Sequence, residues 1–320
     1  MNVVRTFVSP EHGEEQEEVG CLLCGETAHE PVLTASDLLF RKPGKYYLVR
    51  CAACGLEYVN PRPTPAALGP HYPPTYFGYA RPEEAPWFAR PFLLAFAKSI
   101  ALRRIHYIET VTGKFRPEQQ VVDVGCGANG LLRTLRDLRG TLGTGVDFTP
   151  RAVEYVRDVL KMPIVQGTLK GAGFKDAQFD TMTLLEYLEH EPDPMAILGE
   201  ARRVIKDGGH LVVEIPHPTG WVSRLFGKYW WNLDLPRHLV FFSEQTLGKA
   251  FEKTGFELVR TRAFTLPLYV GSSIVQALGE RHWVKNQAWF PLASAFLGAP
   301  FLPFQAVMPE FLFCVARAKP

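Results

Sequence analysis

Four cysteines in two pairs form the most specific chemical pattern in the sequence. Each pair has the form Cys-x-x-Cys-Gly, and the members are Cys21 with Cys24 and Cys51 with Cys54. Two tight turns of this kind can bring four thiolates together, which suits the tetrahedral coordination of zinc. In a chain without a secretion signal, such pairs indicate a metal site rather than disulfides. We therefore predict a zinc ribbon over residues 1–60, in which the metal folds a module with little core of its own.

Two carboxylates and a histidine follow at helical spacing in the second half of the chain. Glu186, Glu189 and His190 stand at positions i, i+3 and i+4, so a helix would place them on one face. Two carboxylates and an imidazole can chelate a divalent cation such as Mg²⁺. Without a metal, the same histidine can remove a proton from a nucleophile or simply cap the helix, so both interpretations stay open.

Short apolar runs alternate with helical segments from residue 119 to the end of the chain. Strands are expected at 120–124, 144–147, 164–166, 179–184, 210–215, 257–263 and 311–316. Helices are expected at 130–138, 150–160, 194–205 and 243–254. This alternation predicts an α/β fold with a mostly parallel sheet, whose ligands bind at the carboxyl ends of the strands.

The first of these strands runs into a glycine-rich turn. The glycines Gly125 and Gly127 allow the backbone to approach a ligand closely. A turn of this kind also opens dinucleotide folds, but Asp123, two residues before the first glycine, argues against NAD. Asp147, at the end of the next strand, can hold two vicinal ribose hydroxyls.

The segments VVDVGCG, GVDFTP, FDTMTLLEYLEH and RRVIKDGGHLVVEIPHP resemble class I S-adenosylmethionine-dependent methyltransferases, of the ubiquinone-biosynthesis O-methyltransferase type, over residues 119–320. The resemblance implies a seven-stranded, mostly parallel Rossmann-like sheet with an antiparallel last strand, and S-adenosylmethionine as cofactor. It implies that the cofactor is bound by Asp123, Gly125, Gly127, Asp147, Phe148, Thr168 and Leu169. The chain departs from the family pattern at Asn129, where a third glycine is usual.

The Glu-x-x-Glu-His segment resembles the metal-binding helix of ubiquinone-biosynthesis O-methyltransferases and of small-RNA 2′-O-methyltransferases. The latter add a histidine after the fifth strand, and His238 stands in the matching place. The resemblance thus implies a divalent site made of Glu186, Glu189, His190 and His238. Metal-free relatives leave a second interpretation open, in which His190 or His238 is the catalytic base and Glu186 faces the sulfonium.

Two apolar stretches lie outside the predicted ribbon and sheet. Residues 264–310 form an apolar insert that is broken by prolines, and residues 87–98 belong to a connector with helices over 61–118. Aromatic residues beside basic ones suit a helix lying at a membrane surface. The alternative is that the insert and the connector build an acceptor lid or a homodimer contact. The aromatic loop 220–235 fits an acceptor pocket or a lid equally well.

The overall composition narrows the partner classes. Lys+Arg number 35 against 33 Asp+Glu, and no basic stripe appears, so a nucleic-acid partner is not expected. The acidic N-terminal run does not resemble a signal peptide, and no apolar run is long enough to span a membrane. We expect a cytoplasmic protein, at most peripheral to the inner face of the membrane.

These observations together predict an S-adenosylmethionine-dependent methyltransferase with a structural zinc ribbon. The expected acceptor is a hydroxyl of a small or lipid-linked metabolite, such as a glycan, isoprenoid or quinone-like compound. A sugar C-methyltransferase is the first alternative, and a non-enzymatic cofactor-binding protein or an RNA methyltransferase is less favoured. The expected organisation is 1–60 ribbon, 61–118 connector and 119–320 methyltransferase domain.

Overall fold

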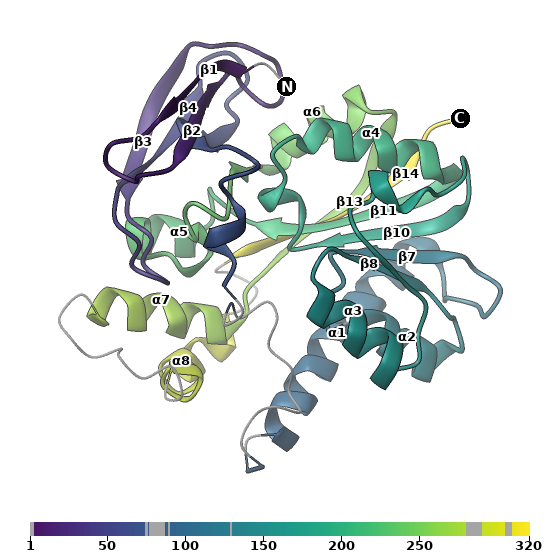
Figure 1. Ribbon diagram of the computed structural model, residues 1–320. Coiled ribbons are helices and arrows are strands. Elements are labelled where there is room, and N and C mark those ends of the chain that lie inside the picture. Colours follow the sequence, from purple (N-terminus) through teal and green to yellow (C-terminus); the bar gives the residue numbers. More distant parts are fainter. Residues whose placement is uncertain are drawn as a thin grey trace.

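A large α/β part and a smaller β-rich part make up the chain (Figure 1). The computed structural model describes residues 3–73, 76, 87–88, 90–128, 130–279, 290–304 and 309–320. Asn129 and residues 280–289 of the predicted insert lie outside this description.

The α/β part is built on a seven-stranded sheet with the order β13-β14-β11-β10-β7-β8-β9. The strands are β7 (Val121–Val124), β8 (Thr144–Asp147), β9 (Ile164–Gln166), β10 (Phe179–Leu185), β11 (Ile205–Pro216), β13 (Phe256–Phe264) and β14 (Phe311–Ala318). The five strands from β7 to β11 pair in parallel, whereas β14 runs antiparallel to both β11 and β13. The predicted fold class is confirmed. The chain leaves β7 toward β8 on one side and reaches β10 on the other, which opens a ligand crevice there.

Helices cover both faces of this sheet. They are α1 (Arg90–Thr112), α2 (Gly130–Arg139), α3 (Pro150–Glu154), α4 (Pro194–Val204) and α6 (Glu244–Lys253). In Figure 1, α4 and α6 lie on one face, and α1, α2 and α3 lie on the other. In β7, Val122 and Val124 pack into the core under α4 and α6, while Val121 packs under α1 and α2. This alternation follows from the two-residue period of a strand buried on both faces. The helix predicted over 150–160 continues after α3 as a π-helical turn, η4 (Tyr155–Val159).

The N-terminal part consists of two small sheets. One contains β1 (Val3–Val8), β2 (Glu15–Val19) and β6 (Arg62–Pro63). The other contains β3 (His29–Ala35), β4 (Tyr46–Cys51), β5 (Glu57–Val59) and β12 (Val240–Phe241). Because β12 comes from the α/β part and pairs with β5, the two parts of the chain share one sheet.

The apolar insert is mainly helical, with α7 (Pro267–Gly279), α8 (Phe290–Gly298) and the 3₁₀-helix η9 (Ala299–Phe304). The first two helices touch backbone to backbone: a Cβ on Gly271 would lie 1.8 Å from the carbonyl oxygen of Ser294. The helix α5 (Trp221–Phe226) lies in the preceding aromatic loop. None of the helices in the described part of the chain combines the length and the apolarity needed to cross a membrane.

Candidate active site

A cavity of about 440 Å³ lies at the carboxyl ends of β7, β8 and β10. The glycine-rich turn after β7 forms one wall, together with Asp147, Phe148 and Thr168 from the ends of β8 and β9. The opposite wall comes from outside the sheet: Leu68, Tyr72 and Tyr76 of the connector, Tyr269 of α7, and Trp231, Asn232, Asp234 and His238. The cavity therefore lies where the α/β part, the connector and the insert meet.

The glycine-rich turn is held in place by Asp147. Its Oδ2 accepts a hydrogen bond from the amide of Gly127 at 2.9 Å, and its Oδ1 accepts one from the amide of Thr149 at 2.8 Å. Gly125 has a φ of 71°, and a Cβ there would lie 2.4 Å from Cδ2 of Tyr187. No other residue fits this position without displacing the tyrosine ring.

Five of the seven predicted cofactor residues line the cavity, and two do not. Gly125, Gly127, Asp147, Phe148 and Thr168 belong to the lining. Asp123 is buried behind it and accepts a hydrogen bond from the Thr183 hydroxyl at 2.6 Å. Burial raises the pKa of Asp123 to about 6, although that hydrogen bond and the charge of Arg104 oppose the shift. Leu169 lies fully buried in the core, next to the turn that presents Thr168.

Residues 186–190 do not form the predicted α-helix, and that expectation is wrong. Glu186 has a φ of 53°, and only the short 3₁₀-helix η6 (Leu188–His190) follows it. Its carboxylate is drawn to Arg104 of α1, whose Nη2 lies 2.7 Å from Oε1, and it accepts a hydrogen bond from Tyr269. The left-handed turn and the ion pair therefore direct Glu186 away from Glu189 and His190.

The other three predicted ligands do come together. Donor atoms of Glu189, His190 and His238 lie within 4.8 Å of one another, and Glu186 does not belong to the group. The two imidazole rings are 4.5 Å apart between centroids. Both carboxylate oxygens of Glu189 are buried without a hydrogen-bond partner among the described residues, and burial raises its pKa well above the ordinary value. A buried carboxyl in this state calls for either a proton or a cation.

Both histidines line the cavity, and in each of them the same ring nitrogen contacts a backbone carbonyl oxygen. Nδ1 of His190 lies 3.1 Å from the carbonyl oxygen of Arg237, and Nδ1 of His238 lies 2.7 Å from that of Asn232. A carbonyl only accepts, so both Nδ1 atoms carry the proton and both Nε2 atoms carry a lone pair. Burial lowers the pKa of His190 to about 3 and also lowers that of His238. Two neutral imidazoles therefore offer lone pairs to a ligand.

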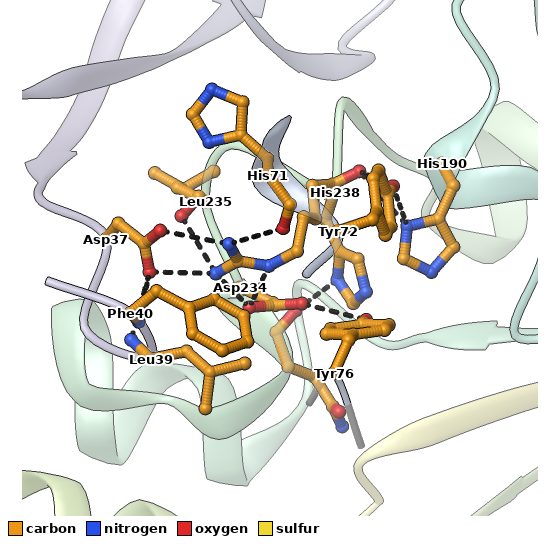
Figure 2. Close-up of polar contacts among 12 residues, drawn as sticks. Asp37, Leu39, Phe40, His71, Tyr72, Tyr76, His190, Asp234, Leu235 and His238 are labelled. Carbon is orange, nitrogen blue, oxygen red and sulfur yellow. Dashed lines mark hydrogen bonds and ion pairs between the residues drawn. The ribbon is translucent and has the colours of Figure 1, made fainter. Parts of the chain in front are cut away.

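A buried ion-pair cluster lies directly behind these histidines (Figure 2). Arg237 contacts Asp37 of the ribbon and Asp234, and Asp234 accepts a hydrogen bond from Tyr76 at 3.1 Å. The hydroxyl of Tyr72 lies 3.0 Å from Nδ1 of His190. The sequence analysis did not identify Asp37, Tyr72, Tyr76, Asp234 or Arg237 as site residues. The aromatic residues Tyr72 and Tyr76 in the connector were the available signal.

The cavity lining is acidic and aromatic. It contains the carboxylates of Asp147, Glu186, Glu191 and Asp234, and none of the described lining residues is Lys or Arg. Its aromatic residues are Tyr72, Tyr76, Phe148, Tyr187, Trp231 and Tyr269. Such a lining favours neutral or cationic ligand groups over phosphates or carboxylates.

The four paired cysteines gather as predicted. Sγ of Cys21 lies 3.4 Å from that of Cys54, Sγ of Cys24 lies 3.5 Å from that of Cys51, and all four lie within 4.8 Å of one another. Four thiolates about 2.3 Å from a tetrahedral zinc would be roughly 3.8 Å apart, so the cluster fits a metal of this size. Burial would raise the pKa of the Cys51 thiol, but backbone N–H groups of Cys54 and Ala53 lower it to about 7, which favours the thiolate.

Comparisons with known proteins identify a family and several relatives. The family described as "Methyltransferase domain" matches residues 95–261, just over half of the chain. A ubiquinone biosynthesis O-methyltransferase of Vibrio atlanticus (strain LGP32) is 31% identical over 116 residues, which are 34% of this chain and 48% of that protein. The chloroplastic 2-methyl-6-phytyl-1,4-hydroquinone methyltransferase 1 of Oryza sativa subsp. japonica is 26% identical over 231 residues, 68% of this chain and 66% of that protein.

The chain thus spans less than two thirds of the length of either relative. Among solved structures, a SAM-dependent methyltransferase from Archaeoglobus fulgidus is 19% identical with a TM-score of 0.47, covering 69% of this chain and 94% of that one. The family match covers β7 to β10 and the turn that forms the cavity wall. The chain belongs to the methyltransferase domain family.

Proposed function

We propose that the protein transfers a methyl group from S-adenosylmethionine to a hydroxyl of a small or lipid-linked metabolite. The glycine-rich turn and Asp147 would bind the cofactor, with both ribose hydroxyls donating to the Asp147 carboxylate and Phe148 beside the adenine. Thr168 would border the adenine, Leu169 would support Thr168 from the core, and Asp123 would support the glycine-rich turn from behind. The names of the two relatives, a ubiquinone biosynthesis O-methyltransferase and a 2-methyl-6-phytyl-1,4-hydroquinone methyltransferase, are consistent with a hydroxyl-bearing ring as acceptor.

The observation that carries the proposal is the pair of neutral histidines facing the cavity. A sulfonium methyl is already activated, so the protein mainly has to align the acceptor and remove its proton. His190 and His238 each carry a lone pair on Nε2, which would accept a hydrogen bond from the acceptor hydroxyl and take its proton as methylation makes that hydroxyl strongly acidic. The described lining contains four carboxyl groups and no Lys or Arg, which disfavours an anionic acceptor and is compatible with an uncharged one such as a phenol or a sugar. Glu186 is held by Arg104 and would shape the cavity rather than take the proton.

A divalent cation is the other role open to the same side chains. Glu189, His190 and His238 would hold it, and the unpartnered carboxylate of Glu189 fits such a ligand. A bound cation such as Mg²⁺ would lower the pKa of the acceptor hydroxyl. The second metal of the proposal is zinc in the cysteine cluster, where four thiolates and no open position fit a structural role.

Methyl transfer can be followed with radiolabelled S-adenosylmethionine and three uncharged acceptors: a catechol, a methyl glycoside and a short polyprenol. We expect transfer to at least one of them and its loss in the double variant His190→Ala, His238→Ala, with cofactor affinity retained. In Asp147→Ala, loss of a charged acceptor worth about 1.5–3 kcal/mol per hydrogen bond should weaken cofactor binding at least tenfold by calorimetry.

The outcomes of these experiments distinguish a metal-binding role of the histidines from a role as catalytic base. Loss of turnover with a chelator and recovery with Mg²⁺ would identify a metal site, while turnover that survives chelation would identify a histidine base. Full activity of the double histidine variant would defeat both roles, and unchanged affinity in Asp147→Ala would reject the cofactor assignment.

We also propose that the enzyme meets its acceptor at a membrane surface. Trp87 and Phe296 are 80% and 79% exposed, and Phe88, Phe92, Leu302 and Phe304 are also exposed. These side chains come from the segment before α1, from α1 itself and from the end of the insert. The competing role of the insert is a lid, which is supported by Tyr269 of α7 in the cavity lining.

A further inference from the structure

The loop between the two cysteine pairs reaches the active site through one buried arginine. Asp37 of this loop accepts two hydrogen bonds from Arg237, one from Nη1 and one from Nη2, both at 2.9 Å (Figure 2). Neither side chain has any exposed surface. The carboxylate is fixed from its own side as well, because Oδ1 accepts hydrogen bonds from the amides of Leu39 and Phe40 at 3.0 and 2.9 Å. Asp37 is therefore a rigid anchor for the guanidinium.

The remaining donors of Arg237 bind the segments that form the cavity wall. Nε and Nη2 donate to Oδ1 of Asp234 at 2.9 and 2.7 Å, and Nη1 donates to the carbonyl of His71 at 3.3 Å. The ring of Phe40 covers the guanidinium, with 5.0 Å between Cζ and the ring centroid. A charge so completely removed from water depends on both carboxylates, and removing one leaves it poorly compensated.

The main chain of the same arginine orients the active-site histidines. Its carbonyl oxygen accepts a hydrogen bond from His190 and one from the hydroxyl of Tyr72, at 3.1 and 3.3 Å. His238 is the next residue, and the amide of Leu239 donates to the carbonyl of Glu189 at 2.7 Å. The position of the Arg237 guanidinium therefore sets the position of the groups around both rings.

We propose that Asp37 is a positioning residue for methyl transfer, which acts through Arg237 to hold His190 as its Nδ1–H tautomer with Nε2 toward the acceptor. This inference rests on the proposed function of His190. Asp37 lies outside the described cavity lining, so it has no direct contact through which to affect cofactor binding. The cysteine ribbon then forms part of the catalytic framework and is not a separable binding module.

The substitution Asp37→Asn keeps the shape of the side chain and removes its charge. Substituting a residue that orients a functional histidine from outside the site typically lowers activity about 10- to 100-fold. We therefore expect Asp37→Asn to lower kcat by about 10- to 100-fold. Cofactor affinity and metal content should stay unchanged. In the background of Arg237→Gln, Asp37→Asn should have no further effect on kcat, because its only route to the site is already lost.

Histidine ¹⁵N NMR supplies a readout that needs no acceptor. We expect one Nδ1–H tautomer for His190 in the natural protein and a mixture with the Nε2–H tautomer in Asp37→Asn. Should Asp37→Asn not fold, Asp37→Glu, which keeps the charge and shifts the carboxylate by one methylene, allows the same comparison. Unchanged ring signals, an unchanged kcat, or additive effects of the two substitutions would overturn the proposal.

Glu109→Gln is the matched control. Glu109 forms a two-point pair with Arg139, at 2.6 and 2.8 Å, on the side of α1 and α2, and neither residue lines the cavity. Its loss should lower Tm and leave kcat unchanged, and an equal fall of kcat would mean that Asp37 acts only through general stability. If His190→Ala keeps full activity, the proposed function fails, whereas an inactive His190→Ala with a fully active Asp37→Asn rejects this inference alone.

Discussion

Glu310 carries a carboxyl group that the folded chain removes completely from water. Its Oε1 accepts hydrogen bonds from Nε1 of Trp230 and Nδ2 of Asn232, both at 3.3 Å, and its Oε2 is buried without a partner among the described residues. Burial raises the pKa of this carboxyl well above its ordinary value. The folded chain therefore keeps Glu310 protonated at a pH where the unfolded chain would release the proton.

This difference predicts that Glu310→Gln is more stable than the natural protein at neutral pH. Above about pH 4.3 the unfolded chain binds fewer protons than the folded one, so rising pH lowers the free energy of unfolding by up to about 1.4 kcal/mol per unit. Glutamine does not ionise, so the variant does not lose this part of the free energy of unfolding as pH rises. Thermal unfolding should give equal Tm values near pH 4 and a higher Tm for the variant at pH 7. Glu257→Gln, at an exposed position, is the control, and its difference in Tm from the natural protein should not grow with pH. A difference in Tm for Glu310→Gln that stays constant with pH would contradict the prediction.

At the level of single residues, the sequence predicted the position of those side chains that come directly after a strand. Asp147, Phe148 and Thr168 lie in the cavity because the carboxyl ends of parallel strands meet at one edge. Glu186 was misplaced because its carboxylate pairs with Arg104, 82 residues away in sequence, and local spacing does not reveal such a contact. The pair of Asp37 with Arg237 joins residues 200 apart, and no local pattern reports such a contact.

At the level of secondary-structure elements, the strand β12 links the cysteine ribbon to the active site. It begins two residues after His238, and its Val240 pairs with Tyr58 of β5. The second cysteine pair lies at the turn between β4 and β5. Loss of the metal should therefore loosen the strand that supports His238, in addition to the ribbon itself.

The double variant Cys51→Ser, Cys54→Ser tests this link. Metal analysis of the natural protein should find about one equivalent of zinc per chain, and the variant should contain none. We expect the variant to lose methyl transfer as well as stability. Ala53→Ser changes the same exposed turn without removing a thiol and should retain both. A double variant that keeps its zinc would rule out the assigned ligands.

The sequence predicted the bounds of regular strands closely, but it did not predict the conformation of irregular segments. The strands β8 and β9 have the predicted bounds, because their apolar runs end at an acid, Asp147, and just before a glycine, Gly167. The segment after β10 was misjudged because three polar residues at helical spacing also fit a left-handed residue followed by a 3₁₀ turn. Helical spacing shows which residues would share a face, but tertiary contacts decide whether the helix forms.

The whole molecule encloses its cavity between parts that are distant in sequence. The α/β part provides one wall, which we propose binds the cofactor, and the connector, the 231–238 segment and α7 provide the other wall, which we propose meets the acceptor. The sequence analysis gave a lid built by the insert and the connector as one of its alternatives, and packing between modules leaves no periodic signal that could decide between them. In Figure 1, α8 and the first turns of α1 both extend to the lower edge of the molecule. The apolar side chains that they expose are thus candidates for one surface.

The membrane proposal predicts sedimentation of the protein with vesicles that contain an anionic lipid. Trp87 and Phe92 are 80% and 59% exposed, and Lys98 of α1 is exposed beside them, so apolar insertion and charge attraction should act together. Burying an aromatic side chain is worth about 1.5–3 kcal/mol, so Trp87→Ser with Phe92→Ser should lower the affinity for the vesicles more than tenfold. Added salt should weaken binding, because it screens the charge attraction.

Val259→Ser provides the control for this experiment, since Val259 is an exposed apolar residue of β13, an edge strand of the sheet. It should leave vesicle binding unchanged, which would locate the membrane contact at α1 and the insert. If the natural protein stays in the supernatant at low salt, the exposed aromatic residues serve a lid or a contact between two copies. A lipid-linked acceptor would then lose its support, and small hydroxyl compounds dissolved in water would remain, because the acidic, aromatic lining accepts them without a membrane.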